Sequence, residues 1–95
     1  MAIDSDFLNP IETGIGYAQG FAARRNPDQK GAPMNRLYVV ENHYTVTGGM
    51  ADHRLRSAPS RILHIAGQIA RELGIPQAGG VDKVTDAKTL SWIKP

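Results

Sequence analysis

The stretch MNRLYVVENHYTVTGGMADHRL, residues 34–55, decides the fold predicted for this chain. It opens with a continuous apolar run, Leu-Tyr-Val-Val at 37–40, and an unbroken run of this kind is typical of a buried strand in a parallel sheet. The pattern predicts a strand over residues 36–41, followed by a loop rich in Thr and Gly over residues 42–57. In α/β sheets, ligands bind where the carboxyl ends of strands open into such loops. This junction is therefore the first candidate for a site.

The clearest helix follows this stretch, at residues 60–73, SRILHIAGQIAREL. Ser60 is the expected N-cap, and Gly74 is the expected end of the helix. The polar face carries His64 and Gln68. The spacing of the apolar residues predicts one apolar stripe on the opposite face, which consists of Ile62, Leu63, Ala66, Ile69, Ala70 and Leu73.

A weaker helix is predicted upstream, over residues 13–25, TGIGYAQGFAARR. Thr13 is the expected N-cap, and three interior glycines each cost roughly 1 kcal/mol against alanine. Residues 6–8 are interpreted as the tail of an earlier strand, and residues 26–33 as a linker. In the tail, residues 75–95, core-forming side chains are few. Trp92 and Ile93 near its end are expected to dock on another surface, and a surface outside this chain is one alternative.

Composition limits the possible functions. The chain has 95 residues, enough for one small domain or a piece of a larger one, and 41% of them are hydrophobic. A net charge of +2, from 11 basic and 9 acidic residues, is too balanced to predict nucleic-acid binding. The chain has no cysteine, so it cannot supply thiolates to zinc or to an iron–sulfur cluster. No apolar run approaches the ~20 residues that span a bilayer, so direct membrane insertion is not expected.

The glycines in TGIGYAQG, residues 13–20, approximate a phosphate-binding loop, in which the backbone approaches a pyrophosphate closely. The third glycine falls one residue late for the dinucleotide pattern, and no lysine follows. The favoured interpretation is a helix start packed closely against a neighbour. A small nucleotide-binding module is kept as an alternative.

The polar residues predict neither a metal site nor a catalytic residue. His43, His53 and His64 are spaced by ten and eleven residues, which matches no familiar ligand pattern. His64 is expected to be solvated. The run Asp52-His53-Arg54 combines an acid, a base and a cation, but no nucleophile is fixed beside it. We expect Asp52 and Arg54 to hold the loop through hydrogen bonds and ion pairs.

Glu41, at the end of the predicted strand, has two interpretations. In a nucleotide-binding α/β domain, an acid at this position can accept hydrogen bonds from ribose hydroxyls. Alternatively, it can bond to backbone N–H groups of the adjacent loop. The residue pattern leaves both interpretations open.

Four segments, taken in order, resemble the molybdopterin-oxidoreductase-like, iron–sulfur subunit of alternative complex III, the Tat-variant-translocated molybdopterin oxidoreductase family. They are DSDFL at 4–8, GYAQGFAARR at 16–25, the stretch 34–55, and SRILHIAGQIARELG at 60–74. The resemblance implies an internal fragment with an α/β fold, a partial Rossmann-like βαβα layer of a molybdoenzyme-like domain. That domain fragment would cover residues 1–74, with the linker at 26–33 and a loop or extension over 75–95.

The resemblance also implies a role in respiratory electron transport. Subunits of this family belong to a membrane-associated, quinol-oxidising complex, and Tat export would place the subunit on the periplasmic side. The implied partners are the rest of its own subunit and the other subunits of the complex. Iron–sulfur clusters are expected elsewhere in the full-length oxidoreductase subunit, and this segment alone is not expected to be catalytic.

The implied cofactor site is a vestigial one. Molybdenum enzymes resemble this region with a strand-end acid, a T-x-T-A-x-x-A-D loop and a P-G-T-D turn, and the match assigns dinucleotide contacts to Glu41, Asn42, Thr45 and Thr47. Ser-Ala-Pro-Ser at 57–60 replaces the turn, so the guanine-reading carboxylate is absent. This departure favours a segment without bound molybdopterin. The alternative is a segment of an active molybdopterin guanine dinucleotide-dependent oxidoreductase.

Overall fold

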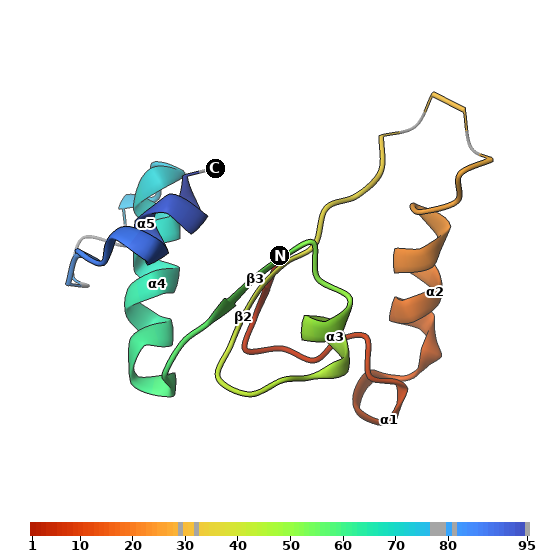
Figure 1. Cartoon of the computed structure of the whole chain (residues 1–95), viewed down its shortest axis with the longest axis horizontal. Helices are drawn as coiled ribbons and strands as arrows, with labels where there is room; N and C mark the ends of the chain where they lie inside the picture. Colours follow the sequence, from red (N-terminus) through yellow and green to blue (C-terminus); the bar gives the residue numbers. More distant parts are fainter. Residues whose placement is uncertain (29, 32, 77–79, 81, 95) are drawn as a thin grey trace.

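The chain folds around a small parallel sheet with helices on both of its faces (Figure 1). The computed structural model describes residues 1–28, 30–31, 33–76, 80 and 82–94. The three strands lie in the order β1 (Ala2–Ile3), β2 (Tyr38–Glu41) and β3 (His53–Arg56). Val39 pairs with Ala2 on one side and with Arg54 on the other, so β2 is the central strand. This arrangement confirms the predicted α/β class.

The helices separate into two layers. In Figure 1, α2 lies on one side of the sheet, and α4 and α5 lie on the other, while the short α3 follows β2. The described ranges contain the helices α1 (Pro10–Thr13), α2 (Ile15–Ala23), α3 (Val46–Gly49), α4 (Pro59–Glu72) and α5 (Ala87–Ile93). No helix in the described part of the chain has the length and apolarity needed to cross a membrane.

Adjacent residues of β2 face the two separate cores. Val39 belongs to a cluster with Leu8 and Leu37, against which Phe21 of α2 packs. Val40 belongs to a second cluster, whose buried members also include Leu55, Ile65 and Val84. Because successive side chains of a strand point to opposite faces, the predicted continuous apolar run is what supplies both cores.

The prediction of a plain loop over residues 42–57 is wrong, because α3 and β3 both lie within it. β3 has the sequence His-Arg-Leu-Arg, and of these residues only Leu55 is buried. A single buried residue between two arginines gives no recognisable alternation, so periodicity could not detect the strand.

The apolar stripe predicted for the long helix is correct at Ile62 and Ile69, which pack against the core, but wrong at other positions. Ile65 is 1% exposed, whereas Leu63 and Leu73 of the predicted stripe are 66% and 73% exposed. Gln68, assigned to the polar face, is buried and donates to the Glu72 carboxylate at 3.0 Å. The helix packs through Ile62, Ile65 and Ile69, which have the spacing expected for one helix face. Its N-cap is Ala58 rather than Ser60.

The upstream helix begins later than predicted. Thr13 ends α1 instead of capping α2, and its hydroxyl donates to the Phe7 carbonyl at 2.7 Å. Gly14 caps α2 with a φ of 77°, a conformation that glycine adopts without strain. A methyl group on Gly16 or Gly20 would meet nothing within 4 Å, so the close packing expected of these glycines is not present. The first strand is β1, not residues 6–8.

The extension after residue 74 contains a helix, α5, that the pattern did not predict. Trp92 of α5 packs edge-on against Tyr38, with ring centroids 5.7 Å apart. Thr89 and Val84 of the same extension are buried. Trp92 therefore docks within this chain rather than on a surface outside it.

Candidate functional site

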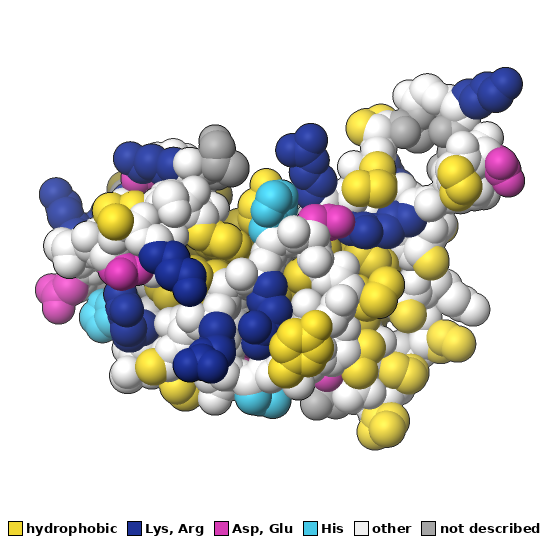
Figure 2. Space-filling model, in the orientation of Figure 1, with side chains coloured by type: hydrophobic (Ala, Val, Ile, Leu, Met, Phe, Trp, Pro, Cys, Tyr) yellow, Lys and Arg dark blue, Asp and Glu magenta, His cyan; other side chains and the backbone are white. Residues whose placement is uncertain are grey.

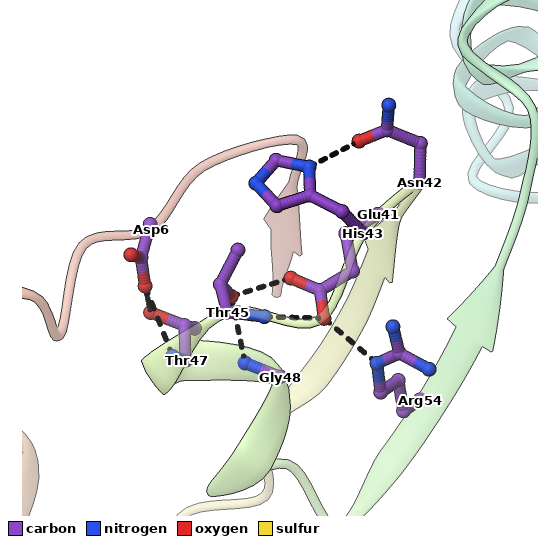
Figure 3. A network of polar contacts seen from close by, with 8 residues as sticks. All are labelled: Asp6, Glu41, Asn42, His43, Thr45, Thr47, Gly48 and Arg54. Carbon is purple, nitrogen blue, oxygen red and sulfur yellow. Dashed lines mark hydrogen bonds and ion pairs between the residues drawn. The ribbon is translucent and has the colours of Figure 1, made fainter.

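A small hollow lies at the carboxyl ends of β1 and β2, the edge of the sheet where the sequence predicts a site. Its volume is about 120 Å³, and its lining is acidic and polar: Asp4, Ser5, Asp6, Glu41, His43 and Thr45. Asp4 has a φ of 50°, in the left-handed region that aspartate tolerates better than most residues. Figure 3 shows the polar network beside this hollow.

Glu41 is the centre of the network. Its side chain is buried, and one carboxylate oxygen accepts from the Thr45 hydroxyl at 2.5 Å (Figure 3). The other oxygen accepts from the Thr45 backbone N–H at 3.3 Å and from the Arg54 Nε at 2.7 Å. This is the second of the two interpretations left open for Glu41, an acid that bonds to the adjacent loop. An ion pair with β3 is added to it.

The hydroxyl of Thr45 continues the network into α3. It accepts from the Gly48 N–H at 3.0 Å and so caps the helix. Gly48 lies directly on the carboxylate, because a Cβ at this position would be 1.8 Å from the Glu41 Oε1. Only glycine leaves room for the buried acid beneath the helix.

A second carboxylate, Asp6, lies in the segment that follows β1 and bonds to the same helix. Its Oδ1 accepts from the Thr47 backbone N–H at 3.0 Å and from the Thr47 hydroxyl at 2.7 Å. That hydroxyl in turn accepts from the Leu8 N–H at 3.0 Å, and the Thr47 side chain is completely buried. No local pattern identifies Asp6 as a partner of Thr47, because the two residues are 41 positions apart in the chain.

Both acids are ionised in this arrangement. Burial alone would raise the pKa of Glu41, but the hydrogen bonds from Thr45 and Arg54 together outweigh burial and lower it. Burial opposes ionisation of Asp6 in the same way, and its hydrogen bonds from Thr47 lower its pKa further than burial raises it. The network is therefore built on two negative charges that face donors.

A separate contact joins α2 to the loop before β3. Asp52 accepts from the Leu37 N–H at 2.6 Å and forms an ion pair with Arg25, whose guanidinium also lies 4.4 Å from the Phe21 ring centroid. The hydrogen bonds from Arg25 and Leu37 lower the pKa of Asp52. Together with the Arg54–Glu41 pair, this confirms that Asp52 and Arg54 hold the loop.

The remaining candidates lie outside the Glu41 network. The Asn42 Oδ1 lies 2.6 Å from the Nδ1 of the neighbouring His43, and both residues are exposed (Figure 3). His53 stacks on Tyr38 at the opposite end of β2, with ring centroids 4.5 Å apart. His64 is half-buried on α4 rather than solvated. Among the described residues, no group of three His, Cys, Asp or Glu side chains could hold a metal ion.

The residues of the network do not fit a pterin dinucleotide. Cofactor pockets usually have volumes of ~300–1,000 Å³, and the hollow has about 120 Å³. Its lining includes Asp4, Asp6 and Glu41, whose charges would repel a pyrophosphate. Of the four positions assigned by resemblance, Glu41, Thr45 and Thr47 come together, but their polar atoms bond to one another, to Asp6 and to Arg54.

Comparison with models of known protein families and with curated proteins finds no match for this chain.

Proposed function

We propose that this chain is a structural, non-catalytic segment of a respiratory oxidoreductase subunit of the alternative complex III type. The motivation is the ordered resemblance of residues 4–74 to the molybdoenzyme-like part of that subunit. The observation that supports the structural role is the burial and hydrogen bonding of Glu41. The residue is 3% exposed, and both of its carboxylate oxygens accept hydrogen bonds from the chain itself.

A carboxylate that binds a ribose must have an oxygen free to accept hydrogen bonds from the ribose hydroxyls. The Glu41 oxygens accept hydrogen bonds from Thr45 and Arg54 instead. Loss of the bonds from either residue would leave the buried charge with fewer donors. An unpaired buried charge is costly, so a ligand would have to replace these bonds as well as form its own. This supports a packing role for the acid.

Backbone N–H groups at the N-terminus of α3 also form hydrogen bonds within the chain. Backbone N–H groups at a helix start can bind phosphate. Here the Thr47 N–H donates to Asp6, and the Gly48 N–H donates to the Thr45 hydroxyl. These two donors already have acceptors within the chain, which favours a segment without bound molybdopterin.

In this proposal, the segment contributes packing and assembly. It belongs to a membrane-associated complex on the periplasmic side, and its partners are the rest of its own subunit and the other subunits. Quinol oxidation and electron transfer belong to the whole complex, with iron–sulfur clusters bound outside this segment. The segment supplies a rigid α/β layer.

The test is cofactor analysis of the full-length subunit. After purification, the subunit is denatured, molybdenum and iron are measured by mass spectrometry, and released pterin is measured by fluorescence after oxidation. We expect iron to be present while molybdenum and pterin stay far below one per subunit. Stoichiometric molybdenum or pterin would overturn the proposal in favour of the active molybdopterin enzyme.

A matched pair of variants then distinguishes the structural segment from a segment of an active molybdopterin enzyme. In an active molybdopterin enzyme, Glu41→Ala should reduce cofactor occupancy, whereas Glu72→Ala, a change of the same kind on α4, should not. In the structural segment, neither variant changes the cofactor content, and Glu41→Ala lowers only the stability.

A further inference from the structure

The outer edge of β3 has backbone groups without a strand partner. The N–H groups of His53 and Ser57 donate to the Leu37 and Glu41 carbonyls, at 3.1 and 2.9 Å. Because the direction of these groups alternates along a strand, the N–H and C=O groups of Arg54 and Arg56 point away from β2. Within the described ranges, no strand lies on that side.

The same two residues place positive charge along this edge. They pair with Val39 and Glu41 in the sheet, so both side chains lie on the face that carries α3. The Arg54 guanidinium lies 4.7 Å from the ring centroid of the exposed Tyr44, and its Nε bonds to Glu41. Arg56 is exposed, and the described side chains give it no ion pair. Figure 2 shows Lys and Arg side chains gathered over β3 and α4.

We infer that the edge of β3 docks an extended segment of a partner protein that carries acidic residues at alternate positions. Such a segment would pair with the outward backbone groups of Arg54 and Arg56 and extend the sheet by one strand. Its alternate side chains would lie beside the two arginines, where carboxylates are favoured. The aromatic ring of Tyr44 would flank the added strand.

A second copy of this chain fits the edge poorly. Antiparallel pairing of β3 with itself around Leu55 would place Arg54 of each copy opposite Arg56 of the other. Like charges directly opposite each other destabilise a sheet. Charge thus favours an acidic partner over self-association.

The experiment measures binding of a fluorescein-labelled peptide, Thr-Glu-Val-Glu-Val-Thr, to the complete chain by fluorescence anisotropy. We expect saturable binding with a Kd of about 1 mM or tighter. A peptide with Lys in place of both Glu residues should not bind. A peptide methylated on its backbone nitrogens keeps the charges but cannot pair with β3, and it should also fail. In the bound state, amide exchange at Arg54 and Arg56 should slow.

Two charge-reversal variants locate the site. Arg56→Glu should weaken binding by about tenfold or more. Lys30→Glu makes the same change of net charge in the loop before β2 and should weaken binding by about twofold at most. Arg56→Gln, which removes the charge without reversing it, should give an intermediate loss. Far-UV circular dichroism verifies that each variant is folded.

Several results would overturn the inference. They are absence of saturable binding, equal binding of the lysine peptide or the methylated peptide, and an equal loss in Lys30→Glu and Arg56→Glu. A chain that sediments as a dimer and becomes a monomer on Arg56→Gln would assign the edge to a second copy instead.

Discussion

The contact between Gly48 and Glu41 gives the sharpest test of the network. In Gly48→Ala, the added methyl carbon would lie 1.8 Å from the Glu41 Oε1, 2.6 Å from its Cδ and 3.0 Å from the Arg54 Nε. Real Cβ atoms do not approach this closely, so the carboxylate must move. Glu41 is buried and accepts three hydrogen bonds, two from Thr45 and one from Arg54, so movement of the carboxylate breaks at least one of them.

The expected magnitude follows from two opposing effects. A hydrogen bond to a charged group contributes about 1.5–3 kcal/mol. The movement of the carboxylate breaks at least one such bond and distorts the geometry of the remaining ones. Alanine in place of glycine in a helix returns about 1 kcal/mol. We therefore expect the free energy of unfolding to fall by about 2 kcal/mol, a large part of the ~5–15 kcal/mol that stabilises most domains.

Urea unfolding measures this change, followed both by far-UV circular dichroism and by the fluorescence of Trp92, the single tryptophan of the chain. The matched control is Gly49→Ala on the same short helix. There the new Cβ would lie 3.5 Å from the Tyr44 ring, an ordinary contact, so the variant should be neutral or slightly more stable. Equal stability of the two variants would refute the tight packing of α3 on Glu41.

Three further changes test the acids and their partners. Thr47→Val keeps the shape but removes the acceptor of the buried Leu8 N–H, so urea unfolding should show a loss of about 1–3 kcal/mol, and Thr47→Ser a smaller one. Asp52→Ala leaves the Leu37 N–H without its acceptor and should cost about 1–2 kcal/mol in the same assay, whereas a neutral result would contradict the role given to this contact. Since the pKa of Glu41 is lowered by folding, its contribution is complete above the unfolded pKa and is lost as the pH falls through the folded pKa. Glu41→Gln should therefore flatten the decline of the urea midpoint as the pH falls below about 5, and an unchanged slope would count against this reasoning.

The central strand and its acidic end could be predicted because they depend on local pattern. An unbroken apolar run at 37–40 needs two covered faces, and the structure places one core on each side of it. The same run points to Glu41 as a candidate site residue, since Glu41 ends the strand. The helix of residues 60–73 was also found, within one residue at each end.

The failures share a physical cause, which is contact between residues distant in the sequence. The register of α4 could not be read from hydrophobicity, because Leu63 satisfies the pattern but Ile65 faces the sheet. The short strand β3 exists because Leu55 pairs with Val40, and its two arginines conceal it. Asp6 had no local signal, because its function depends on a helix 41 residues away.

The network also explains how a helix as short as α3 is ordered. Four residues cannot form a stable helix alone, because nucleation costs more than one turn returns. Here Asp6, from the segment after β1, accepts from the Thr47 N–H, and Glu41, at the end of β2, accepts from the Thr45 hydroxyl. That hydroxyl in turn accepts from the Gly48 N–H. The two acids thus connect both strands to the loop. Binding a nucleotide and anchoring this helix would require the same carboxylate oxygens of Glu41. In this chain those oxygens accept hydrogen bonds from Thr45 of the loop and Arg54 of β3.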